Sequence, residues 1–102
     1  MAAQIFDIDG TIVDYHTNTW IEGAKEFIIG LYRNGHDIIF ITMRGPQDDG
    51  TEWSMENTIK ILKDLDDVGV KYRILFNVQS PRVVFDDGGI YVERRVTNQK
   101  YY

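Results

Sequence analysis

Two carboxylates one residue apart are the most reactive feature of the sequence. Asp7 and Asp9 end an apolar run over residues 3–8, and Gly10 follows at once. Such a run, closed by acids and a glycine, indicates a buried strand that stops where the backbone turns sharply. In α/β proteins, the carboxyl ends of the strands carry the binding and reacting groups. We therefore expect Asp7 and Asp9 to lie in a functional site.

A second acidic pair, Asp86 and Asp87, follows the apolar residues 83–85. If the strands over 3–8 and 83–85 are neighbours, all four carboxylates converge at one edge of the sheet. Four such groups repel one another near neutral pH unless a cation or bound protons relieve the repulsion, and a site of hard oxygen ligands suits magnesium. The sequence therefore predicts a Mg²⁺ site formed by Asp7, Asp9, Asp86 and Asp87.

The elements that must position these acids alternate between strands and helices. The pattern predicts helices over residues 20–34, where Thr19 and Glu22 suggest a capping box, and from Met55 to a close at Gly69. Strands separated by helices imply parallel pairing through right-handed crossovers. The run over 37–42 is typical of a parallel strand covered on both faces. Strands are predicted over residues 3–8, 37–42, 72–76, 83–85 and 90–96.

Composition restricts the kind of protein. The chain has 102 residues, which fits one domain over 1–102, and no apolar run approaches the roughly 20 residues that span a bilayer. It has no cysteine, and its start does not look like a signal peptide, so we expect a cytoplasmic protein. A net charge of -5 without an evident basic face argues against a nucleic-acid partner.

The segment Asp7-Ile8-Asp9-Gly10-Thr11 resembles the first motif of the haloacid dehalogenase (HAD) superfamily, whose members are mostly magnesium-dependent phosphohydrolases. The resemblance covers roughly residues 4–90. It implies an α/β fold of the HAD-type Rossmann-like class, a mostly parallel sheet of about five strands flanked by helices. The segments after the first and second motifs are too short for an inserted domain, so the chain resembles the members that have no cap domain.

The resemblance assigns catalytic roles to the first acids. Asp7 would attack phosphorus and form an aspartyl-phosphate, and Asp9 would protonate the leaving oxygen and then activate water. Mg²⁺ would be bound by Asp7, Asp9 and the acids that end the fourth strand. Of these, Asp87 is favoured as the direct ligand, with Asp86 as the alternative.

The resemblance also implies phosphate-binding residues. Thr42 would supply the hydroxyl of the second motif, with substrate contacts from Gly10, Met43 and Arg44; an exposed loop position is the alternative for Arg44. The lysine that the family places before the fourth strand is missing between Asn77 and Pro81. Arg82 is the nearest cation, and Lys71 is the alternative.

These features predict an enzyme, a Mg²⁺-dependent phosphatase that acts on a phosphomonoester. The substrate would be a small phosphorylated molecule or a phosphoprotein, and an open site without a cap could be completed by a homo-oligomer. The alternative is a noncatalytic module that binds phosphate and metal after losing the third-motif lysine.

Overall fold

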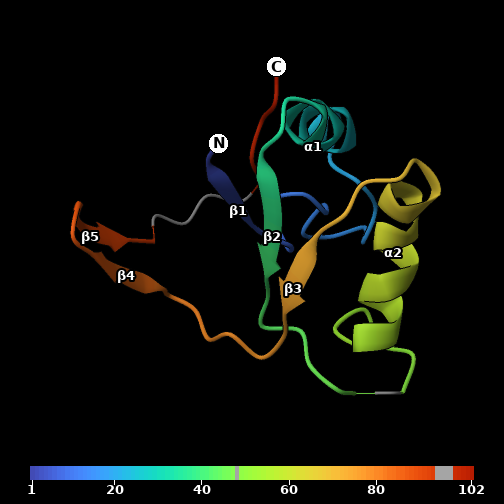
Figure 1. Ribbon diagram of the computed structural model, residues 1–102. Helices are drawn as coiled ribbons and strands as arrows, with labels where there is room; N and C mark the ends of the chain where they lie inside the picture. Colours follow the sequence, from blue (N-terminus) through green and yellow to red (C-terminus); the bar gives the residue numbers. More distant parts are fainter. Residues whose placement is uncertain (48, 94–97) are drawn as a thin grey trace.

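The computed structural model describes residues 1–47, 49–93 and 98–102. The strands β1, β2 and β3 form one parallel sheet in that order, while β4 and β5 form a separate antiparallel hairpin (Figure 1). The elements are, in chain order, β1 (Ala3–Asp7), α1 (Ala24–Arg33), β2 (Asp37–Ile41), α2 (Met55–Asp67), β3 (Arg73–Leu75), β4 (Val83–Asp86) and β5 (Gly89–Val92).

The predicted HAD-type Rossmann-like fold, with a mostly parallel sheet of about five strands, is wrong. The parallel sheet has three strands, and β4 pairs with β5 instead of β1. Residues 76–82 are too few for the helical crossover that a further parallel strand needs. The pair Asp86 and Gly89 closes the hairpin around Asp87 and Gly88, and an Asp-Gly dipeptide between apolar runs is a strong two-residue hairpin signal.

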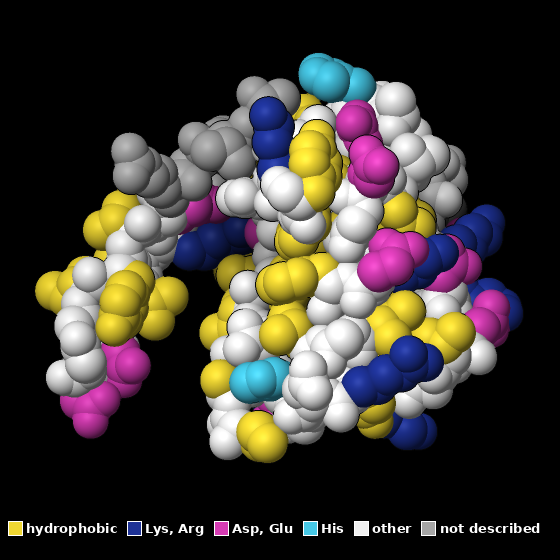
Figure 2. Space-filling model, turned by 90° about the horizontal axis from the view of Figure 1, so that it is seen from above, with side chains coloured by type: hydrophobic (Ala, Val, Ile, Leu, Met, Phe, Trp, Pro, Cys, Tyr) yellow, Lys and Arg dark blue, Asp and Glu magenta, His cyan; other side chains and the backbone are white. Residues whose placement is uncertain are grey.

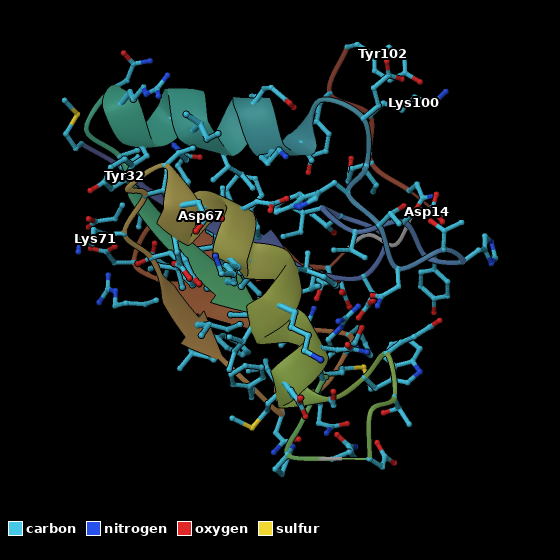
Figure 3. The ribbon with its side chains drawn as sticks, turned by 90° about the vertical axis from the view of Figure 1, so that its right-hand side faces the viewer. Asp14, Tyr32, Asp67, Lys71, Lys100 and Tyr102 are labelled. Atoms are coloured by element: carbon cyan, nitrogen blue, oxygen red, sulfur yellow. The ribbon has the colours of Figure 1, made fainter. Side chains whose placement is uncertain are left out.

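Both helices cover the same face of the parallel sheet. The order β1-β2-β3 advances in one direction, so two right-handed crossovers place α1 and α2 on one side. Figure 3, from that side, shows α2 in front of the strands. Burial alternates accordingly: Phe6 and Phe40 are buried, whereas Ile5 and Leu75 are exposed on the opposite face. The prediction that residues 37–42 form a strand covered on both faces is therefore wrong, because the second face carries no helix.

Helix α1 begins later than the predicted residue 20. Trp20 instead forms an isolated bridge with Val13, which makes residues 13–20 a closed loop. The loop is tightened by Asp14, whose Oδ1 accepts hydrogen bonds from the backbone N–H groups of residues 16 and 17. The chain then enters the helix through Gly23, whose φ of 83° is a left-handed conformation that glycine adopts without strain. No side chain caps this end, so the predicted capping box does not form.

Helix α2 agrees with its predicted start and end. The Ser54 hydroxyl caps it by accepting a hydrogen bond from the N–H of Asn57 at 3.0 Å. The side chains of Thr58, Leu62 and Leu65 recur at helical spacing and are buried. Leu62 and Leu65 pack into the core that the covered face of the sheet provides.

The hairpin β4–β5 extends away from the parallel sheet and exposes apolar side chains on both its faces. Its second strand ends at Val92, and residues 94–96 of the predicted strand 90–96 lie outside the described residues. Within the described part of the chain, neither helix has the length and apolar character needed to cross a membrane.

Candidate functional site

A cleft of about 370 Å³ separates the uncovered face of the parallel sheet from the hairpin. Figure 2 shows the molecule hollowed between these two parts. Asp7 follows Ile5 by two residues in β1, and side chains alternate along a strand. Asp7 therefore lies on the same face as the exposed Ile5. Charged groups from three parts of the chain line the cleft: Asp7, Asp9, Arg82 and Glu93.

Arg82 contacts the Asp7 carboxylate directly. Its Nη1 donates to Asp7 Oδ1 at 2.9 Å, and the two side chains are 11% and 29% exposed. Burial raises the pKa of the Asp7 carboxyl above its ordinary value, while the hydrogen bond and the positive charge of Arg82 oppose that rise. A cation thus reaches the first acid although the chain has no lysine in the third-motif segment. Of the two cations considered from the sequence, Arg82 occupies this position.

Lys71 cannot take that place. It precedes β3 and therefore lies toward the amino ends of the parallel strands, whereas Asp7 is at the carboxyl end of β1. Figure 3 shows the labelled Lys71 near Tyr32, at the far end of the molecule from Asp14.

The Arg82 side chain is held on several sides. Its Nη2 donates to the Val78 carbonyl at 3.0 Å, and Nη1 also reaches Glu93 Oε1 at 3.4 Å. Its Nε is buried and has no hydrogen-bond partner within the described residues. Buried donors are normally satisfied, so Nε is a place where an anionic oxygen could bind if it entered beside Arg82.

Glu93 and Ser80 fix the base of the hairpin. Neither residue was predicted from the sequence. Glu93 Oε2 accepts hydrogen bonds from Ser80 Oγ at 2.6 Å and from the backbone N–H of Arg82 at 3.2 Å. A signal for this contact does exist in the sequence. A hairpin centred on Asp87-Gly88 pairs Val83 with Val92, and continuing that register places Arg82 opposite Glu93.

Arg44 is buried, and its guanidinium binds Asp9. The side chain is 1% exposed; Nε donates to Asp9 Oδ2 at 3.0 Å and Nη2 to Oδ1 at 2.7 Å. Nη2 also donates to Asn18 Oδ1 at 2.6 Å, and Nη1 donates to Thr58 Oγ1 at 3.1 Å. The alternative of an exposed loop arginine is therefore wrong. The expected substrate contact of Arg44 also lacks support, because each guanidinium nitrogen already donates to a protein group.

Thr42 is fully buried at the end of β2. Its Oγ1 accepts a hydrogen bond from the Arg44 backbone N–H at 3.0 Å, and its carbonyl accepts one from Val78 at 2.8 Å. The second of these bonds joins the loop after β2 to the loop after β3. A side chain on Gly45 would collide with Asn77, so this junction is tight. Thr42 is not among the residues that line the cleft, so its expected contact with phosphate lacks support, whereas Met43 does line the cleft.

The predicted meeting of four acids does not occur. Asp86 closes the hairpin and Asp87 occupies its turn; both are exposed, at the end remote from Arg82 and Glu93. Across residues 1–47, 49–93 and 98–102, no group of three or more His, Asp or Glu side chains is arranged to hold a metal ion. The structure therefore does not bring Asp86 or Asp87 to Asp7 and Asp9.

The last described residues bind the loop that follows β1. The N–H of Gln99 donates to the Gly10 carbonyl at 2.8 Å, and the Tyr101 hydroxyl donates to the Thr11 carbonyl. Gly10 turns the chain with a φ of 78°. Tyr101 packs on Phe27, and Figure 3 places the end of the chain beside the start of α1. Gln99 lines the cleft as a result. The sequence carried no signal for this contact.

Comparisons of the chain with known protein families, with curated proteins and with solved structures find no match.

Proposed function

We propose that the protein is a phosphatase that hydrolyses a phosphomonoester through an aspartyl-phosphate on Asp7, with site chemistry of the haloacid dehalogenase type. The observation that carries the proposal is the 2.9 Å contact of Arg82 Nη1 with Asp7 Oδ1 at the floor of a cleft. A phosphoryl group that approached Asp7 would meet a guanidinium, which offsets the repulsion between the carboxylate and the phosphate.

The proposed reaction has two steps. Asp7 attacks phosphorus, and the bond to the ester oxygen breaks as that oxygen takes a proton from Asp9. Asp9 then accepts a proton from water as the water attacks the phosphoryl group, which leaves as inorganic phosphate and restores the Asp7 carboxylate. Arg44 holds the Asp9 carboxylate in place through hydrogen bonds to both of its oxygens.

The expected Mg²⁺ does not fit the donor set of the described residues. Asp7 and Asp9 each accept hydrogen bonds from an arginine, and the other two expected ligands, Asp86 and Asp87, lie at the turn end of the hairpin. The proposed steps therefore use only side chains of the chain itself, and adding Mg²⁺ to the assay tests the expected metal requirement.

A noncatalytic phosphate-binding module is the second candidate. Both Asp9 oxygens accept hydrogen bonds from Arg44, so the Asp9 carboxylate is already bound to a protein group. This arrangement favours binding over proton transfer, and it predicts that phosphate stabilises the protein against heat without turnover.

Hydrolysis of a generic aryl phosphate, with and without Mg²⁺, tests the proposal. We expect Asp7→Asn to lower kcat by at least about a hundredfold, while the control Asp86→Asn, at the exposed end of β4, keeps wild-type activity. Unchanged activity of Asp7→Asn contradicts the mechanism. Phosphate-dependent stabilisation without any turnover supports the second candidate instead.

A further inference from the structure

Exposed apolar side chains gather on both walls of the cleft. Ile5 and Met43 lie on the sheet side, Val84 and Tyr91 belong to the hairpin, and Tyr15 and Trp53 come from loops. Each of these six side chains is about half exposed. A concave surface with apolar walls and a few charged groups at one place is the usual form of a small-molecule site. Burying these apolar side chains against an apolar ligand would be favourable.

The charges at the same place limit how much negative charge a ligand could carry. Arg82 is the one cation among the described residues that line the cleft, against the carboxylates of Asp7, Asp9 and Glu93. Arg44 adds no second anion site, since its guanidinium is buried and donates to Asp9, Asn18 and Thr58. One phosphate can pair with Arg82, and among the described lining residues a second phosphate would find no further cation.

We infer that the ligand of this cleft is a phosphate monoester whose leaving group is a flat apolar ring. The ester phosphate would meet Arg82, and the ring would lie between the hairpin and the aromatic side chains of Tyr15 and Trp53. The cleft volume of about 370 Å³ is near the low end for ligand sites, which suits one ring and one phosphate. This inference rests on the proposed function for the identity of the phosphate group.

Two sources could supply this chemistry, a small aryl or benzyl phosphate and a phosphotyrosine side chain of another protein. Binding measurements do not require turnover, so they separate this inference from the proposed catalysis. We expect benzylphosphonate, which cannot be hydrolysed at its P–C bond, to bind at least about tenfold more tightly than methylphosphonate, because burial of its ring adds apolar contact. Equal calorimetric affinities would overturn the inference.

Neighbouring hairpin residues give a matched pair of variants. Tyr91 lines the cleft, whereas Ile90 is 63% exposed and is not among its lining residues. We expect Tyr91→Ala to lose most of the preference for the ring, and Ile90→Ala to retain it. The inference fails if Ile90→Ala loses as much preference as Tyr91→Ala.

The same preference should appear in turnover if the proposed function holds. Benzyl phosphate and glycerol phosphate both release an alcohol, so their kcat/KM ratio reports mainly on recognition of the leaving group; we expect it to favour benzyl phosphate at least about tenfold. Tighter binding of a phosphotyrosine peptide than of free phosphotyrosine would identify a protein source, and equal binding a small-molecule source. Ring-selective binding without hydrolysis would retain the inference and remove the catalytic proposal.

Discussion

Replacing Arg44 by methionine should destabilise the protein strongly, because Arg44 is the buried charge that holds Asp9. Methionine fills the space with an unbranched apolar side chain but removes every hydrogen-bond donor of the guanidinium group. The two bonds to Asp9 are charge-assisted, and hydrogen bonds to charged groups contribute about 1.5 to 3 kcal/mol each. Breaking a buried ion pair typically costs about 3 to 5 kcal/mol.

The Asp9 side chain is 17% exposed, so water can replace part of what Arg44 supplied. We therefore expect a loss near the lower end of that range, about 3 kcal/mol, out of a total stability of roughly 5 to 15 kcal/mol for a domain. Urea denaturation followed by tryptophan fluorescence measures this loss as a lower midpoint at an unchanged slope.

The control is Lys25→Met, which removes a cation from an exposed pair with Asp64. Those two side chains are 34% and 49% exposed, so the expected cost is only about 0 to 1 kcal/mol. If Arg44→Met costs no more than Lys25→Met, the buried Arg44–Asp9 pair does not stabilise the fold as described.

Four further predictions concern the site and its supports. Arg82→Met removes the hydrogen bond and the charge that oppose burial and so raises the pKa of Asp7 further, which should move the acid limb of the activity profile to higher pH; an unchanged limb would contradict the contact. Glu93→Gln removes a negative charge beside Arg82 and should tighten binding of inorganic phosphate about 3- to 10-fold by calorimetry, whereas weaker binding would mean that Glu93 chiefly holds Arg82 in place. Burial raises the pKa of Tyr101 from its ordinary value of 10.0 to about 12. Between these two pH values the unfolded chain loses the hydroxyl proton first, so the free energy of unfolding falls as the pH rises. Tyr101→Phe should make this fall less steep when urea unfolding is measured at several alkaline pH values. Gly45→Ala requires the side-chain amide of Asn77 to move and should cost about 1 kcal/mol, whereas the helical Gly30→Ala, with open space around it, should stabilise by up to about 1 kcal/mol; similar melting temperatures for the two variants would contradict this.

The regular elements of the first half of the fold could be predicted because each carries a local signal. The apolar runs of β1 and β2 and the helical spacing of Met55, Ile59, Leu62 and Leu65 depend on neighbouring residues alone. The start of α1 could not be predicted from the Thr19–Glu22 pair, since the bridge between Val13 and Trp20 takes those residues into a loop.

The sheet topology was predicted wrongly because two signals in the second half conflicted. The acids that end residues 83–86 suggested a metal site at the edge of a parallel sheet, while the Asp87-Gly88 dipeptide suggested a hairpin turn. The connection over 76–82 is too short for a helical crossover, and it therefore favours an antiparallel hairpin over a further parallel strand.

Only some of the residues expected in the site lie together in the structure. Asp7 and Asp9 do line a cleft, and Arg82 reaches Asp7. The contacts of Glu93 and Gln99 depend on long-range packing, and only Glu93 had a signal, in the hairpin register. Burial of Arg44 depends on Asn18 and Thr58, which come from separate parts of the chain.

The most direct test of the proposed chemistry is a search for the phosphoryl group on Asp7. The protein is mixed with benzyl phosphate, quenched in acid within the first turnover, digested and analysed by mass spectrometry, with Asp9→Asn included because it should slow hydrolysis of the intermediate. We predict a phosphoryl adduct on the peptide that contains Asp7, and a larger amount of it in Asp9→Asn. Turnover of the ester by the wild-type protein with no adduct on that peptide, and with full activity in Asp7→Asn, would contradict the account.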